Sequence, residues 1–450
     1  MVRYACDDFN LFAVRIPLTH CSVDFILQLT YRKPDRQEKD KMMRRDFIFL
    51  ILVPVMCGLL AGCGTLPPRL QESGLNSRFA FSNDMPFGDY IRKTGQMIEN
   101  ARVDINETNR AVILNANLPF ELIPDENKYH RNSNGRYEKG ILLIHGLSDS
   151  PYLMRAVARH FQARGFLVRC VLLPGHGTVP GDLLRVTYRE WVRATEYGVH
   201  QMKLHVEKLY MGGFSTGGAL CVREALNDRE IKGLILFSPA LGIKSPWAFM
   251  ADFLKIFRDW LGNESDDRDY AKYESFTVNA GAQIYHLTRE IDAAFASGKR
   301  LDMPVFTVLS ADDISVDTSK AIDVFKSRVT SERSVLVLCR RGGKKDLEDK
   351  NGRIVYIDSS LPEDRIAGFS HLSLLVPPDD PHYGKTGGYR YCLHYQEDRE
   401  KRMTCLYDPH IWQGEITEEN LMKYTVRRLT YNPRYKEMIR AMDEFLDGVQ

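Results

Sequence analysis

From residue 139 onward, short runs of apolar residues alternate with segments in which apolar residues recur every three or four positions. A short run that is apolar throughout is typical of a strand buried on both faces, whereas the longer period is typical of a helix. We predict strands at 141–144, 166–173, 209–214, 234–237 and 304–309, and helices at 150–164, 188–205, 216–226 and 317–328. This alternation predicts an α/β fold: a mostly parallel central sheet with helices on both faces.

Upstream of this region, the pattern predicts a helix over 89–102 and an early strand over 111–114. Residues 242–300 interrupt the alternation with an amphipathic run that favours an inserted helical lid over a site at the sheet edge. An ordinary packed pair of helices fits the same run. Its apolar face would consist of Met250, Phe253, Leu254, Phe257, Trp260 and Leu261.

Two later segments have other patterns. Residues 334–358 hold two apolar stretches around a polar, glycine-containing centre, which predicts an extra hairpin. Residues 377–418 are rich in tyrosine, histidine and charge without a clear period, so we expect an irregular insertion there. A helix is predicted near 433–447.

The pattern of the N-terminal region predicts a targeting signal rather than a folded domain. Residues 47–60 form an apolar run that is shorter than the roughly 20 residues of a spanning helix. Two arginines precede it and the sequence Leu-Ala-Gly-Cys follows, ending at Cys63, which resembles a bacterial lipobox. We therefore expect a lipoprotein signal peptide at 42–62 and lipidation of Cys63. A signal anchor that happens to contain a cysteine is the alternative.

This interpretation divides the chain. Because a signal peptide begins close to its start codon, we expect translation to start near Met42, with residues 1–41 a non-native extension. Residues 63–88 would be a tether, and 89–450 the folded domain. The protein would be lipid-anchored in a bacterial envelope and face the periplasm. Gly64 is not the aspartate associated with inner-membrane retention, which slightly favours the outer membrane.

The composition and net charge exclude some classes of function. The 450 residues are 44% hydrophobic, enough for a full core, and Lys+Arg 61 against Asp+Glu 59 gives a net charge of +2. Such a balance has no basic footprint, so we expect no nucleic-acid partner. Four residues, Cys392, His394, Cys405 and His410, have spacings that fit no common zinc site. Cys392 and Cys405 either form a disulfide or remain thiols, and no metal or organic cofactor is expected.

The sharpest motif is Gly213-Phe214-Ser215-Thr216-Gly217, where a predicted strand meets a predicted helix. A serine in this turn is strained and exposed at the sheet edge, and small residues on either side relieve clashes. The helix that follows offers N–H groups to an oxyanion, among them that of Thr216. Ser215 is therefore our candidate nucleophile, against a glycine-rich turn with an incidental serine.

A second motif, His145-Gly146-Leu147, follows the first apolar strand. Gly146 lets the chain turn so that the N–H of Leu147 is free to point at the same oxyanion. We interpret His145 itself as structural. His176, in a Gly-His-Gly turn, is expected at the rim of the site.

These residues resemble the α/β-hydrolase fold. Within it, 141–155, 172–191 and 209–221 are similar to the bacterial carboxylesterase and monoacylglycerol-lipase-like group, which also contains the serine aminopeptidases. The resemblance implies a triad in the order serine, acid, histidine. It is convincing over roughly 139–240 and weaker afterwards.

The remaining triad members follow later strands. Asp313 matches the acid loop of the group, with Asp312 as the alternative, and His371 lies after the last predicted strand. Two features depart from the group: Ser310 replaces a glycine, and the 58 positions between Asp313 and His371 are unusually many.

We therefore expect a membrane-anchored serine hydrolase of short or medium acyl esters or monoacylglycerols, acting through Ser215, His371 and Asp313. Its partners would be a small ester or lipid substrate and the membrane. An amidase or aminopeptidase and an acyltransferase of the same fold are alternatives, and a non-catalytic envelope scaffold is an alternative of another class.

Overall fold

The computed structural model describes residues 66–449, apart from 80, 245–249, 262–267, 344–346, 348 and 350, and upstream only Ala5–Cys6 (β1) and Phe9–Asn10 (β2). The chain divides into two compact units after Thr65. In the first unit β1 pairs antiparallel with β2. The predicted signal peptide and Cys63 lie outside the described residues.

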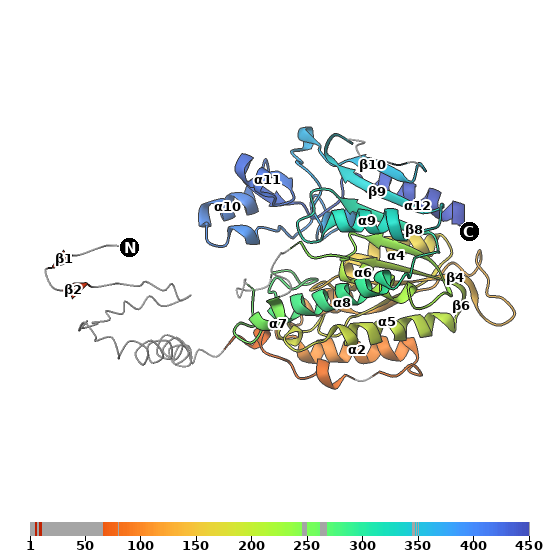
Figure 1. The fold of residues 1–450 in the computed structure, drawn as a ribbon. Coiled ribbons are helices and arrows are strands. Elements are labelled where there is room, and N and C mark those ends of the chain that lie inside the picture. Colours follow the sequence, from red (N-terminus) through yellow and green to blue (C-terminus); the bar gives the residue numbers. More distant parts are fainter. Residues whose placement is uncertain are drawn as a thin grey trace, which may run out of the picture. The chain divides into compact units, whose positions relative to one another are not determined.

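The second unit is built on an eight-stranded sheet in the order β10-β9-β8-β7-β6-β4-β5-β3 (Figure 1). All neighbouring strands are parallel except β3 and β5, which are antiparallel. The mostly parallel sheet predicted from the sequence is confirmed. The strands are β3 (Phe120–Leu122), β4 (Tyr137–Ile144), β5 (Leu167–Val171), β6 (Val206–Phe214), β7 (Ile231–Phe237), β8 (Val305–Ser310), β9 (Val335–Arg340) and β10 (Ile354–Asp358).

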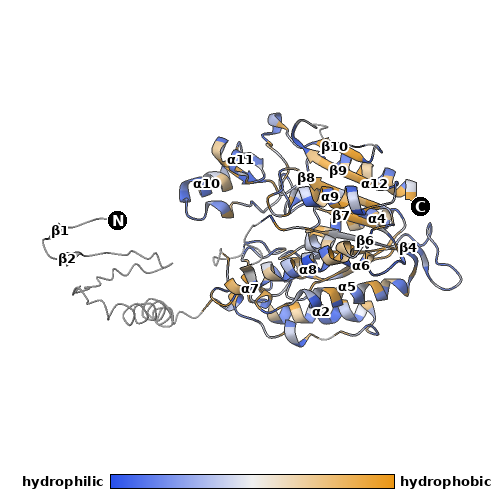
Figure 2. Ribbon diagram, in the orientation of Figure 1, coloured by the Kyte–Doolittle hydropathy of each residue, from blue (hydrophilic) through white to orange (hydrophobic). Residues whose placement is uncertain are grey.

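Helices cover both faces of this sheet, and Figure 2 shows hydrophobic residues concentrated in the strands between them. One face packs against α2 (Phe87–Ala101), α5 (Tyr188–Lys203), α6 (Thr216–Ala225), α8 (Val278–Ala296) and α9 (Thr318–Arg328). The other packs against α3 (Arg110–Asn117), α4 (Arg155–Ala163) and α12 (Tyr435–Val449). The parallel strands bring their carboxyl ends to one edge, where loops from distant parts of the sequence meet.

Two predicted elements are wrong. Residues 111–114 lie in helix α3, where Ile113 and Ala116 are buried three positions apart. The helical spacing of these contacts outweighs the β-propensity of the Val-Ile pair. The segment 334–358 is not a hairpin, because β9 and β10 run parallel with Ile354 opposite Leu336. Strand β10 therefore extends the sheet by one strand, which accounts for the long interval between Asp313 and His371.

The described part of the predicted tether packs against the domain. Leu70 is fully buried, and the Arg69 guanidinium donates to Ser275 Oγ at 2.9 Å. The amide and hydroxyl of Ser73 both donate to Asp182, each at 2.8 Å. From Leu66 onward the chain is therefore folded onto the domain and is not a free tether, because these polar contacts and the burial of Leu70 fix it in place.

The described part of the predicted lid region contains one short and one long helix, α7 (Ala251–Leu254) and α8. Trp260 is buried, but Phe253, Phe257 and Leu261 are 56%, 72% and 52% exposed. The expected apolar face is therefore largely open to solvent in this structure.

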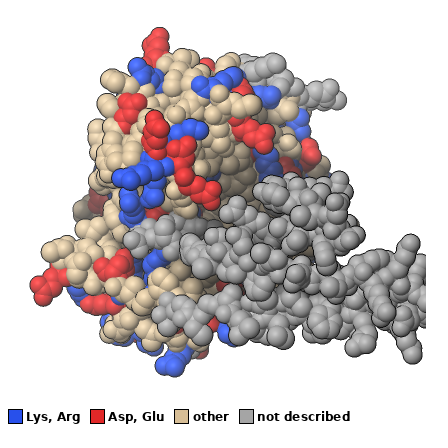
Figure 3. Space-filling view, turned by 90° about the vertical axis from the view of Figure 1, so that its left-hand side faces the viewer, with Lys and Arg blue, Asp and Glu red and all other residues tan. Residues whose placement is uncertain are grey.

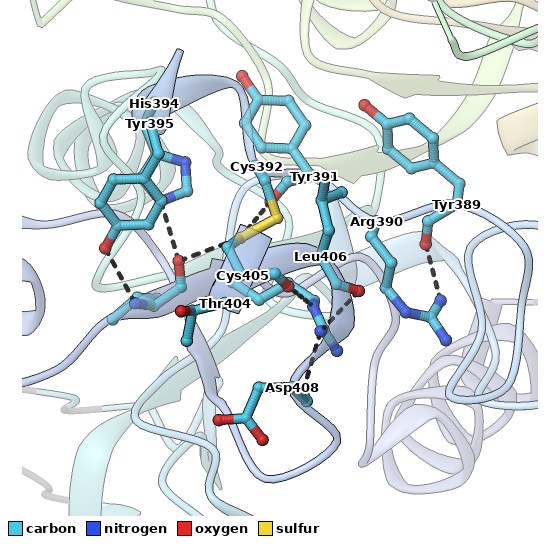
Figure 4. Close-up of a disulfide and its surroundings, with 12 residues drawn as sticks. Tyr389, Arg390, Tyr391, Cys392, His394, Tyr395, Thr404, Cys405, Leu406 and Asp408 are labelled. Carbon is cyan, nitrogen blue, oxygen red and sulfur yellow. Dashed lines mark hydrogen bonds between the residues drawn. A yellow bond between two sulfur atoms is a disulfide. The ribbon is translucent and has the colours of Figure 1, made fainter. Parts of the chain in front are cut away.

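The predicted insertion is held by a disulfide between Cys392 and Cys405 (Figure 4), so these two cysteines pair rather than remain thiols. It contains α10 (Arg399–Tyr407) and a short strand, β11 (Trp412–Gly414). Beyond it come α11 (Glu418–Lys423) and β12 (Val426–Arg428), and β11 and β12 pair in parallel. These elements lie beside the sheet edge that carries the site (Figure 1).

Basic and acidic side chains are interspersed over the described part of the face in Figure 3. Among the helices of the described residues, none is long and apolar enough to span a bilayer.

Candidate active site

Ser215 occupies a sharp turn between β6 and α6. Its backbone has φ 52° and ψ −115°, a conformation that L-residues rarely adopt. A Cβ on Gly213 would lie 2.4 Å from the Gly217 carbonyl, and one on Gly217 would lie 2.1 Å from the Ile144 oxygen. Only glycine fits at either position, so the motif's two glycines are explained by close backbone approach. The turn leaves the Ser215 side chain on the wall of a cavity.

The loop after β4 lies against this turn. A Cβ added to Gly146 would come within 3.2 Å of the Ser215 Cβ, which places the next residue, Leu147, beside the serine. Leu147 and Thr216 line the same cavity as Ser215. Within the described residues, neither of their N–H groups donates a hydrogen bond. Both predicted oxyanion donors are therefore next to Ser215.

Two buried histidines support this loop from behind. The Ser148 N–H donates to Nε2 of His176 at 3.0 Å, and the Leu173 N–H donates to Nε2 of His145 at 3.0 Å. An acceptor Nε2 requires the neutral imidazole with its proton on Nδ1. Burial lowers the pKa of His176 from 6.5 to about 4 and lowers that of His145 as well. His176 thus positions the loop and is not among the cavity's lining residues.

A lysine from the lid region ties the same loop down from the cavity side. Lys272 Nζ donates to Ser148 Oγ at 2.8 Å and pairs with the buried carboxylate of Asp149 at 2.6 Å. The Tyr273 N–H adds a bond to the Ser148 carbonyl at 2.7 Å. The main chain of Ser148, with φ 60°, is therefore held on both sides.

The acid and the histidine meet after β8 and β10. His371 Nδ1 and Asp313 Oδ2 lie 2.6 Å apart, and both side chains are almost fully buried. Asp313 Oδ1 accepts the N–H groups of Ser315 and Val316 at 2.8 and 3.1 Å. Burial alone would raise the pKa of Asp313, but His371 and these hydrogen bonds hold it below the usual value. Asp313 is thus an ionised acceptor that orients the His371 ring.

The alternative acid faces elsewhere. Asp312 pairs with Arg341 Nε at 3.0 Å, so it does not compete for His371. Ser310, which departs from the related group's glycine, donates its hydroxyl to the Phe369 carbonyl at 2.7 Å. This hydroxyl connects the loop carrying Asp313 to the loop carrying His371, so the departure has a local structural role.

Ser215 and His371 line one cavity of about 470 Å³. One of its walls is apolar and comes from 243–284; it consists of Ile243, Leu254, Leu261, Phe276, Val278 and Ile284. Another wall comes from the insertion and the strand after it, through Tyr391, Leu393 and Arg428. Sequence reasoning did not identify these last three residues. The insertion has no periodicity that marks which side chains reach the site, and β12, which carries Arg428, was not predicted.

The described residues contain no group of three or more histidines, cysteines or carboxylates placed to hold a metal ion. Cys392 and Cys405 form the disulfide, and His394 Nε2 lies 2.9 Å from the Val426 carbonyl. What the site offers chemically is a serine hydroxyl, an imidazole oriented by a carboxylate, and two N–H groups.

Comparisons with known proteins support the fold and the enzyme class. The family model described as "Serine aminopeptidase, S33" matches residues 135–274. Together with the fold, the match defines an α/β-hydrolase, and the chain is a serine hydrolase of the lipase- and carboxylesterase-like group.

The individual proteins that the chain resembles have low sequence identity to it. The thermostable monoacylglycerol lipase of Bacillus sp. (strain H-257) is 27% identical over 201 residues, covering 44% of this chain and 80% of the relative. The carboxylesterase of Bacillus subtilis (strain 168) is 21% identical over 207 residues, covering 44% and 81%. Among solved structures, the monoacylglycerol lipase of Paleococcus ferrophilus has a TM-score of 0.40 and 19% identity, covering 49% of this chain and 88% of that one.

Proposed function

We propose that the protein is a membrane-anchored esterase that cleaves short- or medium-chain acyl esters or monoacylglycerols. The observation that carries the proposal is the 2.6 Å contact between His371 and Asp313, with His371 and Ser215 on the wall of one largely apolar cavity. The names of the two curated relatives support ester substrates.

In the proposed mechanism, Ser215 Oγ attacks the ester carbonyl while His371 Nε2 takes its proton. The N–H groups of Leu147 and Thr216 stabilise the negative oxygen of the tetrahedral intermediate. The imidazolium, stabilised by Asp313, then gives its proton to the departing alcohol. A water molecule, activated by the same imidazole, releases the carboxylic acid and restores the free hydroxyl of Ser215. No step requires a redox group or a metal.

The cavity's charges favour an ester over a substrate with a free amine. An aminopeptidase needs a carboxylate available to an ammonium group. Among the residues that the structure describes, the acidic side chains lining the cavity are those of Asp149 and Glu274. Asp149 is engaged by Lys272, and Glu274 accepts from the Tyr389 hydroxyl at 2.5 Å and from the Arg268 N–H at 2.6 Å. Both carboxylates are therefore already used.

Membrane anchoring is supported by the lipobox-like sequence ending at Cys63 and by exposed apolar side chains in α7 and just after it. Leu254 and Leu261 line the cavity, and Phe253, Ile256 and Phe257 are exposed between and beside them. Large exposed apolar groups at a cavity rim are typical of contact with lipid. In this proposal the chain is lipidated at Cys63 in a bacterial envelope, with the outer membrane preferred.

A fluorophosphonate probe tests catalysis. We expect it to label the full-length protein and not the Ser215→Ala variant; absence of labelling in the folded wild type would overturn the enzyme assignment. A panel of p-nitrophenyl esters of rising chain length, run beside aminoacyl anilides, tests substrate class, and a preference for anilides would contradict the esterase proposal.

Growth with an alkynyl palmitate analogue tests the anchor. Label should enter the wild type and be lost in Cys63→Ser, which should also leave the membrane fraction. If the Cys63→Ser chain stays entirely in the membrane fraction, residues 42–62 act as a signal anchor instead.

A further inference from the structure

A buried ion pair lies beside the backbone of His371. Glu415 is fully buried and Arg428 is 8% exposed. The Arg428 guanidinium donates from Nε to Oε1 of Glu415 at 2.7 Å and from Nη2 to Oε2 at 2.9 Å, a bidentate arrangement. Glu415 follows β11 and Arg428 ends β12, and the pairing of Gly414 with Arg428 fixes the two side chains relative to each other.

The pair contacts both loops of the proposed catalytic dyad. Oε2 of Glu415 accepts the backbone N–H of His371 at 3.0 Å. Nη2 of Arg428 also donates to Ser315 Oγ at 3.0 Å, and the Ser315 N–H donates to Asp313 at 2.8 Å. One ion pair therefore connects the histidine loop to the acid loop.

The insertion holds this pair in place. The N–H of Arg428 donates to the Tyr391 carbonyl at 3.2 Å, and the Tyr391 ring lies 5.2 Å from the Arg428 guanidinium carbon. Tyr391 precedes Cys392, which forms the disulfide with Cys405 (Figure 4). The Cys405 carbonyl accepts a hydrogen bond from Arg427 Nε at 2.7 Å. The disulfide thus joins the two chain segments that contact β12, one at Tyr391 and the other at Cys405.

Stability alone is a weak reason for such a pair, because removing two charges from water costs about as much as their attraction returns. The charges have a clearer consequence for the site. Burial by itself would lower the pKa of Arg428. The nearby carboxylate of Glu415 outweighs this and raises the pKa above its usual value, so the guanidinium stays charged. A lone carboxylate at Glu415 would be a second negative group beside His371, in addition to Asp313.

We propose that Glu415 and Arg428 are positioning residues of the active site: they fix the His371 loop relative to the Asp313 loop and cancel each other's charge behind the imidazole. The inference rests on the proposed function. If the proposal is correct, the insertion helps to position the catalytic histidine, because it holds Arg428 in place. Among the described residues, the other charged groups that face His371 are Asp313, which contacts it, and Asp149 with its partner Lys272 and Glu274, which line the same cavity.

The test is the pH dependence of kcat/KM for a p-nitrophenyl ester in the full-length protein. Glu415→Gln leaves a guanidinium without its counter-charge, which disfavours the imidazolium and should move the acidic limb to lower pH. Arg428→Gln leaves an unpaired carboxylate and should move the limb to higher pH. We expect each shift to be on the order of one pH unit. The double variant carries a neutral pair, so its limb should return close to that of the wild type while kcat stays reduced.

Two further variants separate positioning from folding. Arg428→Lys keeps the charge and should leave the limb in place with a lower kcat, so it tests the inference even if Arg428→Gln fails to fold. Glu121→Gln breaks a partly buried pair with Arg169 at the opposite edge of the sheet and should leave the limb unchanged. Shifts in the same direction for both glutamine variants, or no shift in folded protein, would overturn the inference. An inactive wild type would instead overturn the proposed function.

Discussion

Replacing His176 with glutamine tests whether a neutral imidazole supports the loop that carries Leu147. The pKa of His176 is about 4 in the folded protein because the ring is buried, against 6.5 for an exposed histidine. Since the folded pKa is depressed, the stabilisation is fully present above pH 6.5 and is lost as the pH falls toward 4. Near pH 5 the unfolded chain has taken up almost a full proton at this position, whereas the folded ring is about nine-tenths neutral.

The linkage relation then gives a loss of about 2 kcal/mol between pH 7.5 and pH 5 from this residue alone. Glutamine retains an acceptor for the Ser148 N–H and does not titrate, so the His176→Gln variant should lack this part of the pH dependence. Urea unfolding of both proteins at the two pH values measures the difference. His130, which is exposed, provides the matched control, His130→Gln. Equal pH dependence in wild type and His176→Gln would refute the assignment of a neutral, buried ring.

Gly217→Ala should abolish fluorophosphonate labelling or soluble expression, because its Cβ would meet the Ile144 carbonyl oxygen at 2.1 Å; Gly88→Ala in α2, where no atom lies within 4 Å, should label normally and lose no stability. Labelled, soluble Gly217→Ala would contradict the close packing of the turn. Cys392→Ser removes the cross-link to Cys405, so the free energy of unfolding should fall by about 3 kcal/mol and activity should decline, as it should for the wild type in reductant. A reductant that lowers the stability of Cys392→Ser as well would point to another cause.

Much of the site was predictable because parallel strands deliver their following loops to one edge. Ser215 after β6 and His371 after β10 needed only a strand and a special turn or loop to be located. The choice between Asp312 and Asp313 needed tertiary contacts: Arg341, which engages Asp312, lies beyond the next strand.

Other features had no local signal. A hairpin and a parallel pair both show two apolar stretches around a polar connection, so β9 and β10 were indistinguishable from a hairpin in the sequence. Val112 and Ile113 carry β-branched side chains, and the packing that favours a helix here, such as that of Leu114 against Met97 and Ile98 of α2, is not visible in the sequence. Glu415 and Arg428 were missed because their roles depend on a partner 13 positions away and on loops more than 40 positions upstream.

The order of these elements along the chain has a consequence for biosynthesis. Ser215 and its turn are complete early, but the histidine loop is completed by residues made much later: the Ser370 hydroxyl donates to the Leu429 carbonyl at 2.5 Å, and Glu415 receives its counter-charge from β12. A nascent chain that has left the ribosome only as far as α10 would hold a serine without a fixed base. Hydrolysis would thus be withheld during synthesis until the distal segment has emerged and joined the fold.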